Sequence, residues 1–506
     1  MRSTLLPRIL ASLLLGIIAV TAASAQEKDL FKSPNFPVTF GPNNLGTEFF
    51  LSFPANWEAN SGDKFVRLYI SAGVETRVVV TAGPTFRREV TTIPNDIVTV
   101  DMPNTVAQVF VRNDRAPVPD DQVYKGAAVQ IKANDPIIVY GMNRTTFTSD
   151  GLLALPVNAL GKKYIVASAR SVAGGVQELP SQFMIIAPYD QTVVSINMSD
   201  DTPNNREGDN VTVRLDSGDV FSSMSLGFYG DLSGTVIVSQ NNPIAVMGGQ
   251  NCTYLPDERY PACDHIVEML TPVESWGTYY HSLPFQDRTK GDTYRIFAGA
   301  PDTKVFINGS LQATLPNIGG SNGSGWIEYR QDERMPMEFS SDKPIFVAQY
   351  NNSQTYDGAT ATDPFFMLLS PIEQFQTDLI FSTPGDDFAT NYVQIVCDSA
   401  GLDSVEIARA GTDQWQLVTR AQGLAGVGQF PTVIDGLPYR GLTLAIEPGV
   451  WRLRGPRPMA GYIYGGGSFD SYGYPAAMAT RHLRTGDTSV PSISGGADSV
   501  SGGFVG

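Results

Sequence analysis

The chain has 506 residues and a formal net charge of −16, with only three histidines and three cysteines. This acidic balance argues against a nucleic-acid partner and against an anionic membrane surface, because both would be repelled. The length predicts about three or four domains.

The N-terminus has the three parts of an export signal. Arg2 and Arg8 supply a basic region, residues 9–20 are an unbroken apolar run, and Ala-Ser-Ala at 23–25 fits a cleavage site. The apolar run is shorter than the ~20 residues that a membrane-spanning helix needs, although an uncleaved anchor is the alternative. We therefore expect residues 1–25 to be removed. The remaining chain would be secreted or held at the cell surface, with no membrane insertion.

Four segments of the chain repeat one pattern of strand-like runs. Each copy opens with one run, continues with a hairpin-like pair, and closes with a run introduced by proline, such as DPIIVYGMN. The opening runs are GTEFFLSFP (46–54), GKKYIVASA (161–169), GTYYHSLPF (277–285) and QTDLIFSTP (376–384). Alternating apolar and polar residues predict strands, and a period of roughly 100 residues is the size of a small domain.

These repeats predict an all-β protein, built as a tandem array of about four antiparallel β-sandwich-like units. The expected parts are a leader (26–45), units at 46–160, 161–276, 277–375 and 376–484, and a flexible Gly/Ser-rich tail (485–506). The alternative is that the repeats close into a propeller-like ring, although each unit is longer than the ~40–50 residues of a usual blade.

Apolar segments connect one unit to the next. HIVEMLTPVESWG (265–277) has the clearest helical periodicity in the chain and is interrupted by Pro272. We expect a short helix there, capped by Asp264. Residues 151–161 and 364–375 are its equivalents in other units.

Cys252 and Cys263 enclose a short loop, and in an exported chain they predict a disulfide. Such a bridge adds only about 2–3 kcal/mol in the chain-entropy model, so we expect it to hold one loop in shape. Cys397 lies in a strand-like run and is expected to be a buried free thiol. Loops 111–127 and 251–264 are the best candidates for partner contact. The predicted loop-pinning or binding residues are Tyr254, Asp257, Glu258, Arg259, Tyr260, Asp264 and His265.

Patterns for catalysis and metal binding are weak. Residues 319–323 match G-x-S-x-G but lie in a turn-like stretch without the strand and helix of a nucleophile elbow. Cys263-Asp264-His265 lacks a second ligand pair at zinc spacing. The acidic pairs at 120–121, 200–201 and 386–387 are typical of solvated turns. We therefore predict no catalytic residue, no metal and no cofactor.

CDHIVEMLTPVESWGTYYHSLPF (263–285), followed by GDTYRIFAGAPDTKVFING (291–309), resembles the N-terminal domain of IgGFc-binding proteins. KPIFVAQYNN (343–352) and DPFFMLLSPIEQF (363–375) share the resemblance, which covers roughly 46–480. Its most specific part is Cys-Asp-His followed by Pro-x-x-x-Trp-Gly. The resemblance implies a secreted β-rich module, which in animal members lies beside mucin-associated domains and is linked to binding the Fc part of immunoglobulin. The short export signal and the low cysteine count are typical of a bacterial, stand-alone form.

We therefore predict an exported, non-enzymatic binding or adhesion protein that presents loops to an extracellular protein or glycan. Two alternatives remain open, a cell-envelope carbohydrate-active enzyme and a purely structural surface or matrix protein. Two carboxylates facing each other in a cleft would favour the enzyme. A concave aromatic patch would favour glycan binding, and regular contacts between molecules would favour a structural role.

Overall fold

The computed structural model describes residues 43–57, 65–110, 117–174, 177–385, 388–434, 437–467 and 470–483. The chain divides into Met1–Phe40 and Gly41–Gly506, and the fold below is that of the second part. The expected export signal, most of the expected leader and the Gly/Ser-rich tail lie outside the described residues.

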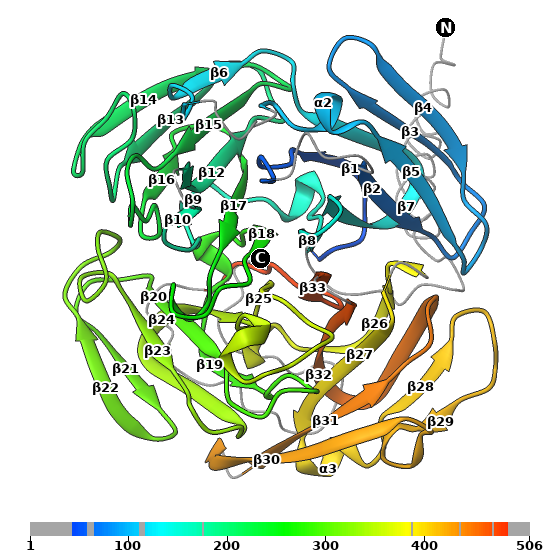
Figure 1. The fold of residues 1–506 in the computed structure, drawn as a ribbon. Coiled ribbons are helices and arrows are strands. Elements are labelled where there is room, and N and C mark those ends of the chain that lie inside the picture. The colour runs from blue at the N-terminus through cyan, green and yellow to red at the C-terminus, as the bar shows by residue number, and fades with distance from the viewer. Residues whose placement is uncertain are drawn as a thin grey trace, which may run out of the picture. The chain divides into compact units, whose positions relative to one another are not determined.

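The first repeat forms a seven-stranded antiparallel sheet around one long strand, β7 (Figure 1). Its strands are β1 (Gly46–Leu51), β2 (Phe65–Ser71), β3 (Arg77–Ala82), β4 (Phe86–Thr91), β5 (Ile97–Met102), β7 (Val129–Arg144) and β8 (Ser149–Leu153), with helix α2 (Asn104–Ala107) after β5. The first half of β7 pairs with β1 and β3, and its second half pairs with β2 and β8. The sheet therefore curls into two layers that share β7.

The second repeat has the same plan, but its long strand is interrupted. Its strands are β9 (Lys163–Ile165), β10 (Val172–Gly174), β11 (Gln177–Leu179), β12 (Ser181–Ile186), β13 (Thr192–Asn197), β14 (Asn210–Leu215), β15 (Val220–Met224), β16 (Val236–Ser239), β17 (Ala245–Thr253) and β18 (Asp264–Met269). β16 and β17 take the places of the two halves of β7, so the two layers are separate sheets.

The third and fourth repeats return to one continuous long strand each, β24 and β32. The third contains β19 (Gly277–Ser282), β20 (Thr293–Ala298), β21 (Thr303–Ile307), β22 (Ser310–Leu315), β23 (Trp326–Arg330), β24 (Met337–Tyr350) and β25 (Phe366–Leu368). The fourth contains β26 (Gln376–Ser382), β27 (Thr390–Asp398), α3 (Ser399–Leu402), β28 (Glu406–Arg409), β29 (Gln416–Leu417), β30 (Leu424–Ile434), β31 (Leu437–Ala445), β32 (Val450–Gly467) and β33 (Asp470–Pro475). The fold class predicted from sequence is thereby confirmed as nearly all-β, with antiparallel curled sheets in tandem.

Single turns of 3₁₀ helix occur in the connections. They are η1 (Val157–Ala159), η2 (Val273–Ser275), η3 (Gln354–Tyr356), η4 (Ile372–Gln374) and η6 (Val418–Arg420). Three of them, η1, η2 and η4, lie at equivalent places, just before the opening strand of the next repeat.

The hairpin-like pairs expected in each repeat are not hairpins. β2 and β3 do not pair with each other, because both pair with β7, at different halves. The same holds for β20 and β21 on β24, and for β27 and β28 on β32. The turn between the two runs therefore carries the chain from one layer to the other.

The expected short helix after Asp264 is also wrong. Residues 264–269 form strand β18, and only η2 follows, behind Pro272. All six residues of β18 are buried. A short apolar run that is buried on both faces has no period to distinguish a strand from a helix.

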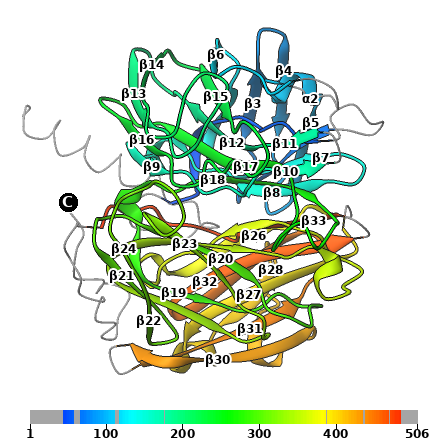
Figure 2. The same ribbon diagram turned by 60° about the vertical axis from the view of Figure 1, so that its left-hand side comes forward.

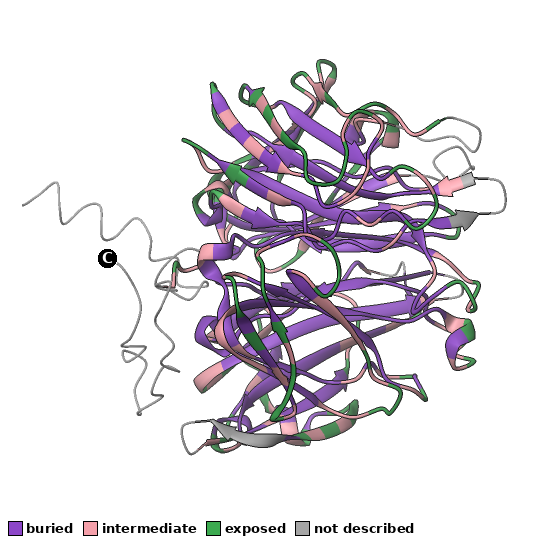
Figure 3. Ribbon diagram, turned by 90° about the vertical axis from the view of Figure 1, so that its left-hand side faces the viewer, coloured by how far each residue is buried: buried purple, intermediate pink, exposed green. Residues whose placement is uncertain are grey.

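The four repeats meet at their inner strands, β8, β18, β25 and β33. β8 contacts β18 and β33, and β25 contacts the same two strands. In Figure 1 these strands lie at the centre, and the longer strands of the four sheets lie around them. In Figure 2, β8, β18 and β33 lie between the first two repeats above and the last two below. Asn43 forms an antiparallel bridge with Ala479, which links the start of the first repeat to the end of the fourth. Buried residues follow the strands, and exposed residues lie mainly in the loops (Figure 3).

One carboxylate, that of Asp150, binds all four inner strands. Its Oδ1 accepts hydrogen bonds from the N–H groups of Gly151 at 2.8 Å and Gly473 at 3.3 Å. Its Oδ2 accepts from Val267 at 3.0 Å and Phe366 at 3.2 Å. In each repeat, the donor residue is paired across the sheet with the residue six positions after the proline that introduces the closing run of that repeat. The four donors are therefore equivalent positions of the repeats. Burial raises the pKa of Asp150 well above its ordinary value, although these N–H groups act in the opposite direction.

Candidate functional site

In the second and third repeats, a long loop joins β17 to the inner strand β18 and β24 to the inner strand β25. These loops cover residues 254–263 and 351–365. The two loops pack against each other. The Ser353 N–H donates to the Leu255 carbonyl at 2.8 Å, and the rings of Tyr260 and Tyr356 meet edge to face with centroids 4.9 Å apart.

The predicted disulfide between Cys252 and Cys263 is present, with Cα atoms 5.3 Å apart. Cys252 lies at the buried end of β17, where it packs against Val172 and Leu179. The bridge therefore fixes both ends of the loop to the scaffold. Cys397 is free and buried, as predicted.

The loop between the two cysteines is less exposed than its composition suggested. Leu255, Pro256 and Asp257 are buried, whereas Glu258 and Arg259 are exposed. The reason is the neighbouring 351–365 loop, which sequence spacing alone could not place beside it.

The charged residues of the loop are paired with arginines. Asp257 binds Arg259 and Arg330, both at 2.7 Å, and Glu258 binds Arg170 at 2.6 Å. The hydrogen bond from Arg259 is the main reason why the pKa of Asp257 lies well below its ordinary value. Two of these arginines belong to the wall of a cavity.

That cavity, here called the polar cavity, has a volume of about 350 Å³. Residues of the second and third repeats and of the disulfide loop surround it, among them Arg170, Asp231, Tyr254, Arg295, Trp326 and Glu328. Ser321 of the G-x-S-x-G match is also in its wall, within a turn. Among the described residues, no hydrogen bond joins Ser321 to a histidine.

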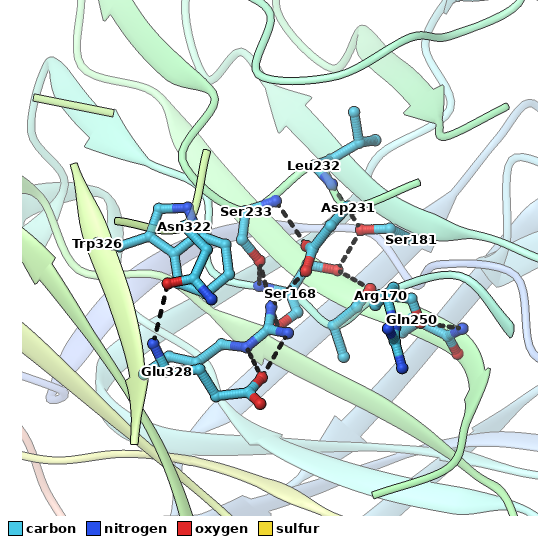
Figure 4. Close-up of polar contacts among 12 residues, drawn as sticks. Ser168, Arg170, Ser181, Asp231, Leu232, Ser233, Gln250, Asn322, Trp326 and Glu328 are labelled. Carbon is cyan, nitrogen blue, oxygen red and sulfur yellow. Dashed lines mark hydrogen bonds and ion pairs between the residues drawn. The ribbon is translucent and has the colours of Figure 1, made fainter. Parts of the chain in front are cut away.

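Arg295 is the centre of the polar contacts in this wall. Its guanidinium donates to Asp231 at 2.8 Å and to Glu328 at 3.0 Å, and lies 4.6 Å from the Trp326 ring. It also donates to the Ser168 carbonyl at 2.9 Å. Figure 4 shows these four partners converging from both repeats. Burial acts to lower the pKa of Arg295, but the carboxylates of Asp231 and Glu328 outweigh it and raise the pKa.

A second cavity, here called the aromatic cavity, has a volume of about 470 Å³. Its wall includes Trp57, Phe147, Tyr254, Ala262, Gln354 and Asp363. Tyr254 therefore borders both cavities. Asp363 is only 2% exposed, and burial raises its pKa to about 7.

Asp264 and His265 do not lie at the loop surface. They are the first two residues of β18 and are fully buried. Asp264 Oδ1 accepts from the N–H of Ser149 at 2.6 Å, and the Asn143 amide donates to His265 Nε2 at 2.9 Å. Burial lowers the pKa of His265 to about 4, so its ring is neutral at pH 7. Both residues therefore connect the first and second repeats.

Loop 111–127, the other candidate for partner contact, is described only from residue 117. Its residues Gln122–Tyr124 form β6, which pairs with β15 of the second repeat. Asp121 accepts a hydrogen bond from the Ser223 hydroxyl at 2.8 Å. This part of the loop joins two repeats.

In the described ranges, no group of three or more His, Cys, Asp or Glu side chains has the arrangement of a metal site. No helix in the same residues is long and apolar enough to cross a membrane.

The family model for IgGFc binding protein matches residues 150–465, which is more than half of the chain. The chain belongs to the IgGFc-binding protein family. The IgGFc-binding protein of Homo sapiens is 23% identical over 356 residues, which cover 68% of this chain and 6% of the human protein. The chain thus corresponds to a small part of that relative, and the family match includes the disulfide loop and the polar cavity.

Sequence reasoning found the disulfide loop but missed Trp57, Phe147, Arg295 and Trp326. Arg295 had a usable signal, because it interrupts the apolar strand run YRIFAG, where a charged side chain must find a buried partner. Trp57 and Phe147 had none, since they belong to a different repeat from the loop they face.

Proposed function

We propose that this chain is an exported, non-enzymatic binding protein that presents the Cys252–Cys263 loop to an extracellular protein partner. The main support is the position of Tyr254. It borders both cavities and lies on a loop that a disulfide fixes at both ends. A rigid scaffold with a pinned loop favours recognition, because little conformational freedom is lost on binding. Membership of a family named for IgGFc binding supports a protein partner.

A glycan is the second candidate partner. The polar cavity contains Trp326 and Tyr254 together with arginine and carboxylate side chains. Aromatic faces with a few convergent polar groups suit a sugar ring. The sequence alone left this alternative open.

The ion pairing of two carboxylates in the polar cavity, whose wall also contains Asp200 and Glu207, favours binding over glycoside hydrolysis by this pair. Asp231 and Glu328 are the two carboxylates that flank Arg295, and both are held by its guanidinium at 3.0 Å or less. A glycosidase needs one such group as proton donor and the other as base or nucleophile.

The test is binding of the purified protein to immobilised IgG Fc and to a glycan array. We expect saturable binding to Fc or to a defined set of glycans, and a loss of ~10-fold or more in the variant Tyr254→Ala. Tyr189→Ala is the matched control, because Tyr189 is 45% exposed and lies in neither cavity wall.

Two results would contradict the proposal. One is the absence of saturable binding to both surfaces. The other is equal binding by the wild-type protein and by Tyr254→Ala, with circular dichroism showing that both are folded.

A further inference from the structure

The aromatic cavity combines apolar walls with a carboxylate in its lining. Trp57, Phe147 and Tyr254 contribute rings, and Pro261 and Ala262 add apolar surface. Phe147 is 54% exposed. The faces of aromatic rings attract cations, and the cavity volume is in the range of small-ligand sites.

The carboxylate of Asp363 is buried and has few partners. Among the described residues, its side chain accepts one hydrogen bond, from the Gln354 N–H at 3.4 Å. A buried carboxylate is normally paired or accepts several hydrogen bonds. Asp363 therefore has capacity to accept from a donor in the cavity.

Further carboxylates lie near Asp363. Asp470 and Asp264 both interact with it electrostatically, and Oδ2 of Asp264 is buried without a hydrogen-bond partner. Arg288 acts in the opposite direction on Asp363, but it is itself paired with Asp357 at 2.9 Å. Asp470 is itself paired with Arg144 at 3.2 Å, and burial raises the pKa of Asp264 well above its ordinary value. Asp363 is thus the acidic residue that the cavity wall presents.

We propose that the aromatic cavity binds an ammonium group on an apolar stem, the chemistry of a lysine side chain. The stem would contact the rings of Trp57, Phe147 and Tyr254, and the ammonium would donate to Asp363. A neutral sugar fits less well, because the wall offers only a few polar side chains for its hydroxyls. This proposal adds a ligand chemistry to the proposed binding function. It rests on that function in one respect, that the lysine belongs to a protein partner.

Binding should be linked to the proton on Asp363. Its pKa is about 7 without a cation, and an ammonium favours the ionised form. The charged groups that face Asp363 are Arg288, which opposes protonation, and Asp470 and Asp264, which favour it. Affinity for an ammonium should therefore rise between pH 6 and pH 8.

The test is calorimetric titration of the full chain with two capped amino acids of the same stem. Nα-acetyl-lysine methylamide carries the ammonium, and Nα-acetyl-norleucine methylamide lacks it. We expect the lysine compound to bind at least ~10-fold more tightly at pH 8. The variant Asp363→Asn should remove that preference.

Asp292→Asn is the matched control variant. Asp292 is also buried with a pKa of about 7, but it lies outside the cavity wall. This variant should bind the lysine compound as the wild type does. Cadaverine serves as a third ligand, and its binding without that of the capped lysine would identify a free amine as the source of the ammonium.

Equal binding of the two capped compounds, or an unchanged preference in folded Asp363→Asn, would overturn the proposal. So would the absence of binding by all three ligands. That last result leaves the proposed function intact if Fc or glycan binding through the polar cavity is still observed, so the two failures are distinguishable.

Discussion

Asp150 shows how one side chain can hold strands from four repeats. Its carboxylate accepts an N–H from each inner strand. A carboxylate can do this because its two oxygens together have lone pairs for about four hydrogen bonds. The sequence gives no hint of this role, because Asp150 precedes a glycine in what reads as an ordinary turn. The equivalent positions in the other repeats are Ile266, Phe365 and Tyr472.

Replacement of Asp150 by asparagine should destabilise the whole fold. An amide nitrogen cannot accept a hydrogen bond, so two buried N–H groups would lose their partner. We expect the free energy of unfolding to fall by about 2–6 kcal/mol in urea denaturation. The control is Asp413→Asn at an exposed position, which should change it by less than ~0.5 kcal/mol. Equal stability of the two variants would contradict the role of Asp150.

Asp292 predicts a dependence of stability on pH. Burial raises its pKa in the folded state to about 7, above the ordinary value of about 3.9 for the unfolded chain. The folded state therefore binds the proton more tightly. The resulting stabilisation is fully present below pH ~4 and is lost as the pH rises through about 7.

Asparagine at position 292 does not titrate. The free energy of unfolding of Asp292→Asn should therefore rise relative to that of the wild type as the pH increases. We expect the difference in unfolding free energy to shift in favour of Asp292→Asn by about 2–4 kcal/mol between pH 4 and pH 8. Parallel urea titrations at several pH values measure this shift. A constant difference would show that the Asp292 carboxyl is not protonated near neutral pH.

The disulfide loop is the element that sequence reasoning placed best. Cysteine spacing and the predicted export signal identified the bridge between Cys252 and Cys263 without structural knowledge. The contact with the 351–365 loop could not be predicted, because it depends on how two repeats meet. The helix predicted within 265–277 was wrong for a related reason. Contacts with other repeats bury both faces of strand β18, so its sequence lacks the alternation of apolar and polar residues that indicates a strand.

Loss of the bridge should affect the loop more than the sheets. Cys252→Ser should lower the free energy of unfolding by about 2–3 kcal/mol, with little change in the far-ultraviolet circular dichroism of the folded protein. Cys397→Ser is the control, since that thiol is free and its replacement breaks no bridge. Global unfolding of Cys252→Ser at 25 °C would show that the bridge is needed for the fold as a whole.

At the scale of the whole molecule, the fourfold repeat of the strand pattern could be predicted from the sequence. The contacts that bring the four repeats together could not. Four copies of a strand pattern predicted tandem β units, and the structure confirms antiparallel curled sheets. The pairing of both middle runs with one long strand was missed, because adjacent strand-like runs usually form hairpins. The contacts among β8, β18, β25 and β33 follow only once the sheets are assembled.

We propose that a partner binds at the face formed by loops 254–263 and 351–365. Hydrogen–deuterium exchange of the full chain, with and without a saturating Fc fragment or glycan selected by the binding screen, tests it most directly. We expect slower exchange in residues 251–263 and 351–363 on binding. Protection confined to distant segments, such as the β3–β4 hairpin at 77–91, would contradict it.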